Sequence, residues 1–544
     1  MVPDAVTYPL SFSQQRLLAA AAGPRCTAAF GIRVRGPLDA DALRRALEEV
    51  VLRHAPLRTR FRVDMGSLRQ AVVAHAPGPL PITDLRGRHA PFRAAVRSIE
   101  AERGRIRPLD AAPLRMRLYR LADDDHVLAV AVHQAVADAD SLAIIRREIA
   151  QRYAAHVVGR AATVDEPDRQ YGDVACWQRL RLAAGGLDAG IAHWRQVLRG
   201  AAPALRRPNG TRSDDAFAPA DIHCRIEIPP AVVARLRSTG RRVGVSLTSV
   251  VVAALHVLVW TGTAADDVVI GVAVPNRHRP ELRTLVGPLA AVVPVRARLH
   301  PSDPILRTLV AIEAVWSAGR PYRETPVEAA IEDPDAADAA FQLQFRLSRG
   351  NPSDARFPGA TVEAIALRSR APGCAVAWEL TEDAAGLRGR VLLDGRAFTV
   401  GAAQQVTAAF REVLQRLPSG LHHPLGRFVA ALDAAGAGAQ WAQPAAAGDG
   451  PGPGPRGRAA WFGVAPRSAT EQALLSIWRD VLQDDRLGIF DSFFDQGGSS
   501  TLAARAVLEI RRRLQVAIDV SVLFEAPTVA AVAAEIERTP GGGG

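Results

Sequence analysis

The segment DSFFDQGGSSTLAARAVLEIRRRL (491–514) contains a serine whose position suits a covalent phosphate ester. Gly497 and Gly498 permit backbone angles that a Cβ atom would forbid, and Ser500 follows them as the expected N-cap of a helix. Free N–H groups and the positive end of the helix dipole would stabilise a phosphate at that place. We therefore expect Ser500 to be a modification site. The alternative is an ordinary serine-capped helix after a glycine turn.

The segment HQAVADA (133–139) brings a histidine, a glutamine and an aspartate to the end of a predicted strand. His133 and Gln134 close the strand HVLAVAVHQ, and a helix is predicted after Asp138. Such strand ends commonly hold functional side chains. An imidazole changes its protonation near neutral pH, whereas an amide only donates and accepts hydrogen bonds. Because side chains alternate along a strand, His133 points to the face opposite that of Gln134 unless a β-bulge redirects it. We therefore expect His133 to be a buried, hydrogen-bonded histidine.

Strand-like and helical patterns alternate on both sides of this segment. Apolar runs at 126–134, 266–274 and 289–299 predict strands, while 39–54 and 141–156 show helical spacing. This mixture indicates an α/β or α+β architecture. The longest apolar stretch, 250–260, is too short to span a bilayer, so we expect a buried helix there.

Composition excludes some classes of function. The chain has 544 residues, 48% of them hydrophobic, and a formal charge of +11, but all of its 67 basic residues are arginine. These arginines are scattered through apolar segments instead of forming a stripe, so a nucleic-acid-binding protein is only a remote alternative.

Cys26, Cys176, Cys224 and Cys374 are isolated, which predicts a reduced chain without a zinc or disulfide framework. Without a signal peptide at 1–15, we expect a cytoplasmic protein with no membrane segment.

The chain divides at a segment rich in Ala, Gly and Pro. Residues 436–465 show no apolar periodicity and predict an extended linker. Residues 466–538 then carry three or four helical patterns, including 471–482 and a short helix after Pro527, which suits a small bundle. The tail 539–544 is typical of a flexible terminus. Residues 466–540 hold eight arginines against eleven acidic residues, so an acidic module follows a basic one and charge favours their docking.

Residues 8–435 resemble a condensation domain of a nonribosomal peptide synthetase, and five of that family's motifs occur in order. They are YPLSFSQQRLL (8–18), RHAPLRTRF (53–61), YGDVACWQ (171–178), the long segment 266–296 and YRETPVE (322–328). The resemblance implies two lobes of the chloramphenicol acetyltransferase type, approximately 8–180 and 181–435, with a tunnel between them. The expected fold class is thus an α/β (α+β) two-lobed domain followed by a small all-α carrier domain.

The segment around Ser500 resembles the G-G-x-S attachment motif of a peptidyl carrier protein. The register of this motif favours Ser500 over Ser499, so the resemblance implies a 4'-phosphopantetheine arm on Ser500, placed there by a phosphopantetheinyl transferase. We find no adenylation motifs and no thioesterase elbow, so we expect a separate adenylating enzyme to load the carrier in trans. Upstream and downstream carrier or synthetase proteins are the other implied partners, while nucleic acid and membrane are not.

The condensation motif H-H-x-x-x-D-G is incomplete in this chain. His133 and Asp138 keep their positions, but Gln134 replaces the second histidine and Ala139 replaces the glycine. In the family Asp138 would have a structural role, and Arg277 is the expected partner of its carboxylate. If the second histidine acts as a general base, its replacement by Gln134 would lower the rate by about 10²–10⁴-fold. If it only positions the amine, the Gln134 amide would retain part of that role. Ala139 would strain a turn that glycine normally occupies.

Two hypotheses of function remain open. In the first, the protein is a condensing acyltransferase that joins carrier-bound substrates through an amide, in preference to an ester. In the second, the condensation-like domain is inactive and serves as a platform that binds partners and presents the carrier. Ser141 falls at the serine position of the heterocyclising motif D-x4-D-x2-S, but one serine and the shared Asp138 do not support cyclisation.

Overall fold

The computed structural model describes residues 6–19, 27–64, 67–74, 80–103, 106, 113–160, 162, 164, 167–205, 222–263, 265–331, 337, 340–350, 357–365, 367, 374–395, 397–434, 466, 468–482, 487, 489, 493, 500–516, 518–525 and 528–538. The predicted linker 436–465, the tail 539–544 and Cys26 lie outside these residues. The chain forms two compact units, the first made of residues 1–299, 306–421 and 434–446. The second contains 300–305, 422–433 and 447–544.

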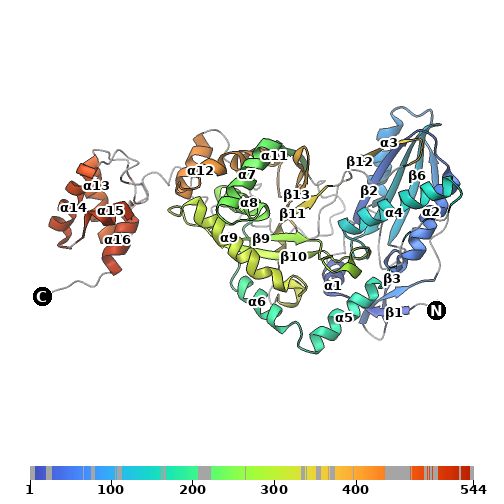
Figure 1. The fold of residues 1–544 in the computed structure, drawn as a ribbon, viewed down its shortest axis with the longest axis horizontal. Coiled ribbons are helices and arrows are strands. Elements are labelled where there is room, and N and C mark those ends of the chain that lie inside the picture. Colours follow the sequence, from blue (N-terminus) through green and yellow to red (C-terminus); the bar gives the residue numbers. More distant parts are fainter. Residues whose placement is uncertain are drawn as a thin grey trace, which may run out of the picture. The chain divides into compact units, whose positions relative to one another are not determined.

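A five-stranded sheet organises the N-terminal part of the first unit, where Figure 1 labels its strands β2, β6 and β12. The strand order is β12-β2-β7-β6-β5. Only β5 and β6 in this sheet are parallel. Its strands are β2 (Thr27–Arg35), β5 (Ile82–Asp84), β6 (Leu114–Ala122), β7 (Asp125–His133) and β12 (Thr361–Ile365). β12 comes from the C-terminal half of the chain and pairs with β2, so the two halves share this sheet.

Helices cover both faces of this sheet because β7 is apolar on both sides. Val130 and Val132 pack into a core with α2 (Ala40–Arg53) and α4 (Ala139–Val157). Val127 and Ala129 face a second core with α3 (Pro91–Arg103). Asp39 caps α2 by accepting hydrogen bonds from the N–H groups of the first turn.

A smaller antiparallel sheet of order β1-β4-β3 lies in the same part of the chain. Its strands are β1 (Val6–Pro9), β3 (Thr59–Asp64) and β4 (Ser67–Val72). The neighbouring helices are α1 (Phe12–Ala19), η1 (Ala55–Arg58) and α5 (Tyr171–Ala183), whereas α6 (Asp188–Leu198) packs against β10 (Ala291–Arg298) of the larger sheet. His54, from the motif RHAPLRTRF, is buried in this part of the chain, and its Nε2 lies 3.0 Å from the Glu148 carboxylate.

A six-stranded mixed sheet forms the other part of the first unit, in the order β10-β9-β11-β13-β14-β8. β9, β11 and β13 are parallel neighbours, and the remaining pairs are antiparallel. The strands are β8 (Ile222–Ile228), β9 (Asp267–Val274), β10 (Ala291–Arg298), β11 (Leu343–Arg349), β13 (Val376–Asp383) and β14 (Gly386–Leu393). The helices of this part are α7 (Pro230–Arg242), α8 (Leu247–Thr263), η2 (Pro280–Leu282), α9 (Ile305–Gly319), η3 (Arg320–Tyr322), η4 (Val327–Ala329), α11 (Val400–Arg416) and η5 (Leu417–Ser419).

The predicted elements of the first unit are confirmed to within a few residues. The strands expected at 126–134, 266–274 and 289–299 are β7, β9 and β10, and the helices at 39–54 and 141–156 are α2 and α4. The apolar stretch 250–260 lies in α8 and is buried. Among the described residues no single helix has the length and apolarity to cross a membrane, and the bent pair α7 and α8 meets those criteria only jointly.

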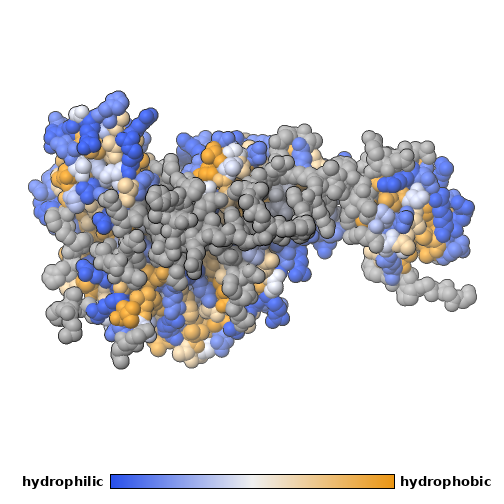
Figure 2. All heavy atoms as spheres, turned by 180° about the vertical axis from the view of Figure 1, so that it is seen from behind, coloured by the Kyte–Doolittle hydropathy of each residue, from blue (hydrophilic) through white to orange (hydrophobic). Residues whose placement is uncertain are grey.

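The second unit holds a small helical bundle, as expected for residues 466–538. Its helices are α13 (Ala469–Leu482), α14 (Ser500–Leu514), α15 (Val520–Glu525) and α16 (Val529–Arg538), and the unit also includes α12 (Leu425–Ala434). Trp478 and Phe493 pack edge to face in the bundle core, with ring centroids 5.3 Å apart. On the face of the molecule in Figure 2, hydrophilic and hydrophobic residues of the described chain are interspersed.

Candidate functional site

His133 is a buried, neutral histidine at the end of β7. Only 2% of its surface is exposed, and it shares the face of Val127 and Ala129 on the strand. Its Nδ1 accepts a hydrogen bond of 3.1 Å from the Ala135 N–H. Burial lowers the pKa of the imidazole to about 4. The structure therefore places His133 as the sequence analysis expected, as a satisfied buried side chain.

A tight turn connects β7 to α4 and carries Gln134. Ala135 is fully buried, and its carbonyl accepts a hydrogen bond of 3.1 Å from the Gln14 amide. Gln134 itself is half-buried between the ends of the two elements. Ala139 is the exposed first residue of α4 and has no positive φ angle. The expected strain at Ala139 is therefore wrong, because a helical residue with an open Cβ position does not need glycine.

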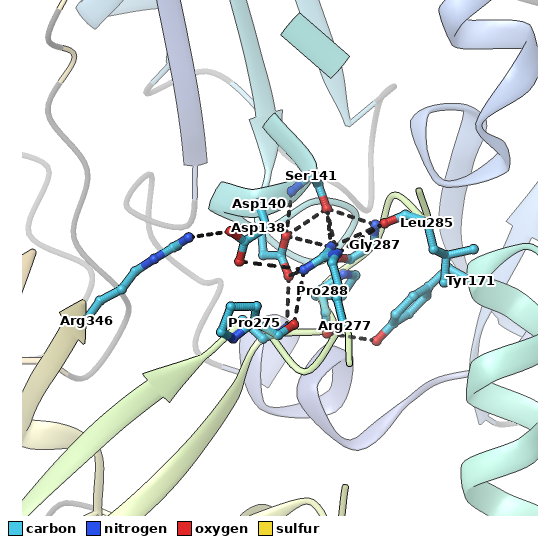
Figure 3. A network of polar contacts seen from close by, with 11 residues as sticks. Asp138, Asp140, Ser141, Tyr171, Pro275, Arg277, Leu285, Gly287, Pro288 and Arg346 are labelled. Carbon is cyan, nitrogen blue, oxygen red and sulfur yellow. Dashed lines mark hydrogen bonds and ion pairs between the residues drawn. The ribbon is translucent and has the colours of Figure 1, made fainter. Parts of the chain in front are cut away.

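Asp138 caps α4 and forms an ion pair with Arg277 (Figure 3). The Arg277 guanidinium donates from Nη1 to Oδ2 and from Nη2 to Oδ1, both at 2.9 Å. Asp138 also accepts hydrogen bonds from the N–H groups of Ser141 at 2.8 Å and Ala290 at 2.9 Å. Burial alone would raise the pKa of this carboxyl, but Arg277 and Ser141 outweigh it and hold the pKa below its usual value. The contact between Arg277 and Asp138 is the one that the family resemblance implied.

Ser141 and Gly287 complete this network. The Ser141 hydroxyl lies 2.7 Å from Asp138 Oδ1 and accepts hydrogen bonds from the Gly287 N–H and from Arg277 Nη2. Ser141 is fully buried, so its hydroxyl braces the loop between β9 and β10. The Tyr171 phenol donates to the Pro288 carbonyl at 3.1 Å and lies 2.8 Å from the Ser11 hydroxyl. Burial raises the pKa of the Tyr171 phenol.

Asp140 joins α4 to the six-stranded sheet. Its Oδ1 lies 2.7 Å from Nη2 of Arg346 on β11, and its Oδ2 lies 3.7 Å from Nη1 of Arg277. Figure 3 shows Arg346 approaching Asp140 from the side opposite to Ser141. Burial raises the pKa of the Asp140 carboxyl, although Arg346 opposes that rise. The sequence analysis missed this pair, because 206 residues separate its members and neither lies in a recognisable motif with the other.

Glu324, from the motif YRETPVE, binds two basic residues of the segment 266–296. Arg279 donates to both of its carboxylate oxygens at 2.9 Å, and His278 Nε2 lies 2.6 Å from Oε1. Arg279 also lies over the Trp177 ring, 5.5 Å from its centroid. Arg279 and these contacts hold the pKa of Glu324 below its usual value against the effect of burial. These motif residues therefore have a structural role, because their contacts hold the segment between β9 and β10 in place.

Ser500 is the first residue of α14, a helix of 15 residues. Gly497, Gly498 and Ser499 lie outside the described residues. A phosphate ester at the first position of a helix of this length suits the free N–H groups of the first turn, so the position fits a phosphopantetheine arm. The described residues contain no group of His, Cys, Asp or Glu side chains that could hold a metal ion.

Comparison with known protein families gives two matches. Residues 5–348 match the family model for a condensation domain, and residues 472–536 match the model for a phosphopantetheine attachment site. The order of the two matches is the order that the sequence analysis expected, and the second match indicates a covalently attached 4'-phosphopantetheine.

Curated relatives are large biosynthetic synthases and synthetases. Phosphinothricin tripeptide synthetase PhsC from Streptomyces viridochromogenes is 31% identical over 63% of this chain and 33% of its own length. Chondramide synthase cmdD from Chondromyces crocatus is 29% identical over 61% of this chain and 9% of its own length. The matched region therefore spans a third or less of these relatives.

Solved structures share the fold. The X-domain from teicoplanin biosynthesis is 25% identical, with a TM-score of 0.68 over 77% of this chain and 96% of that structure. The condensation domain of the Monacolin K polyketide synthase MokA has a TM-score of 0.66 at 22% identity, covering 78% of this chain and 100% of that structure. The chain therefore has the two-part fold of condensation domains, as the sequence resemblance implied.

Proposed function

Because this chain belongs to the condensation domain family and carries a phosphopantetheine attachment domain after it, we propose that it is a component of a nonribosomal peptide synthetase. Condensation of carrier-bound thioesters is the role of that family. The arm on Ser500 would supply a thiol that holds an aminoacyl or acyl group as a thioester. The partners that follow are a phosphopantetheinyl transferase, a separate adenylating enzyme and neighbouring carrier proteins, all in the cytoplasm.

We further propose that the condensation domain acts as a platform that binds carrier-borne intermediates and does not itself supply a general base. The observation that carries this proposal is the pair His133 and Gln134. His133 is buried with its Nδ1 engaged, and Gln134 has no basic nitrogen near neutral pH. The X-domain, a relative of similar fold, was solved in complex with OxyB, which supports a partner-binding role for such a domain.

A second candidate, an active condensing acyltransferase, is favoured by the intact brace of Asp138 and Arg277. This ion pair still holds the turn that carries Gln134 against the segment between β9 and β10. In this case Gln134 would orient the acceptor amine by hydrogen bonding, and the amide would form by attack of that amine on the thioester carbonyl with loss of the thiol.

An acyl-transfer assay distinguishes the inactive platform from the active condensing acyltransferase. The full chain, with its arm attached and loaded with an aminoacyl group, would be mixed with a loaded donor carrier, and products would be followed by mass spectrometry. We expect no transfer above a Ser500→Ala control with the native chain. We expect a gain of about 10² or more in the Gln134→His variant, which restores the base. Native transfer that persists in Gln134→Asn but disappears in Gln134→Ala would instead establish a positioning amide.

A further inference from the structure

A hollow on the six-stranded sheet part of the first unit is lined by basic side chains and lies outside the network of Asp138. Its volume is about 340 Å³. It is formed by the end of α7, the start of α8 and the carboxyl ends of β11 and β13. The lining residues are Arg237, Arg241, Val245, Ser246, Leu247, Thr248, Leu347, Arg349 and Glu382. We propose that this hollow binds a small phosphate monoester.

The three arginines converge because of their places in the elements. Arg237 and Arg241 are four residues apart on α7, so they lie on one face of that helix. Arg349 ends β11 and is opposite Glu382 in the register of the parallel pair β11 and β13. Carboxyl ends of parallel strands beside a helix are a common place for anionic ligands.

The charges in the hollow do not cancel. Three guanidinium groups face one carboxylate, which leaves an excess of two positive charges. Glu382 pairs closely with Arg237, while the Arg349 Nε lies 3.9 Å from Glu382. The Arg241 side chain has no ion pair with any residue that the structure describes, and it is exposed. A phosphate monoester is doubly charged near pH 7.5 and accepts hydrogen bonds from two guanidinium groups, so it matches the free capacity of Arg241 and Arg349.

Space beside the hollow admits the organic part of such a ligand. A second hollow of about 280 Å³ shares Arg237, Arg241 and Glu382 with the first and continues along α7. Its other lining residues include the apolar side chains of Pro230, Val233 and Ala234, together with Asp383, whose carboxylate is paired with Arg388. A ligand with a phosphate at one end and a small apolar group at the other would occupy both hollows.

Calorimetric titration of the full chain tests this site, with phenyl phosphate and inorganic phosphate as probes at low salt. We expect one saturable site for both probes, with phenyl phosphate binding more tightly. Arg241→Gln and Arg349→Gln should each weaken binding by about tenfold or more, because each removes a charge-assisted hydrogen bond. Thermal melting would establish that both variants are folded, and both sites of substitution are exposed.

Arg242→Gln is the matched control, because Arg242 is exposed on the same helix and does not line the hollow. It should leave the affinity within about twofold. Absence of saturable binding to the native chain would overturn the proposal. Equal weakening by Arg242→Gln and Arg241→Gln would also overturn it, because that result indicates only general attraction to a positive surface.

Discussion

Arg277 and Asp138 are 139 residues apart in the chain, yet their side chains form two parallel hydrogen bonds of 2.9 Å. The pair joins the helix that follows β7 to the segment between β9 and β10. Both side chains are at least nine-tenths buried. Because Arg277 also donates to the Gly287 carbonyl at 3.1 Å, the same guanidinium holds the loop that faces Tyr171. The brace therefore fixes the position of Gln134 relative to the six-stranded sheet.

Removing one member of this pair should strongly destabilise the fold. Arg277→Gln and Asp138→Asn each leave the opposite charge buried, which typically costs about 3–5 kcal/mol. The free energy of unfolding in urea would measure the loss. Arg298→Gln is the matched control, because Arg298 pairs with Asp267 at the surface and its side chain is 78% exposed. If Arg277→Gln cost no more than the control, the pair would not be a structural brace.

Gly287→Ala should be more harmful than alanine at a glycine of positive φ that has open space around it. A Cβ atom at Gly287 would lie 2.1 Å from Cδ2 of Tyr171, so the buried ring would have to move. We expect a loss of stability of about 3 kcal/mol or more, because overpacking adds to backbone strain. In the control Gly244→Ala, φ is +71° but no atom lies within 4 Å, so only the backbone strain of about 1 kcal/mol remains. Thermal unfolding of both variants would test the difference.

The replacement of glycine by Ala139 should have little effect on the site. Ala139 is exposed at the first position of α4, so Ala139→Gly removes a helix-favouring residue without relieving strain. We expect a loss of less than about 1 kcal/mol in unfolding free energy. In the acyl-transfer assay, Gln134→His/Ala139→Gly should match Gln134→His alone. A clear gain from the second substitution would contradict the helical geometry at Ala139.

Much of the fold follows from the sequence because its elements have clear periods. The runs of β7, β9 and β10 and the spacing of α2 and α4 predict these elements directly. The pairing of β12 with β2 does not follow, since more than 300 residues separate the strands and local pattern carries no partner information. Arg277 was predictable as the partner of Asp138 only through the family resemblance. The Asp140–Arg346 ion pair could not be predicted from the sequence, because each residue by itself resembles an ordinary surface charge.

Modification of Ser500 can be tested without any knowledge of the substrate. Incubation of the full chain with coenzyme A and a phosphopantetheinyl transferase should raise the intact mass by one phosphopantetheine group. Ser500→Ala should abolish the increase, while Ser499→Ala should leave it, because Ser500 begins α14 and Ser499 precedes it. The opposite pattern would move the attachment site by one residue.

His133 should make the stability of the fold depend on pH in a defined interval. Its pKa is about 4 in the folded chain, against 6.5 ordinarily, so the unfolded chain binds the proton first as pH falls. The resulting stability is fully present above about pH 6.5 and is lost progressively toward pH 4, by about 3 kcal/mol over the whole interval. Urea unfolding of native and His133→Gln chains at pH 7.5 and 5.0 would measure this, and the variant should lose less stability on acidification. His89→Gln, at an exposed histidine, should behave like the native chain. Equal losses in all three chains would mean that His133 takes up its proton in the folded state as easily as in the unfolded state.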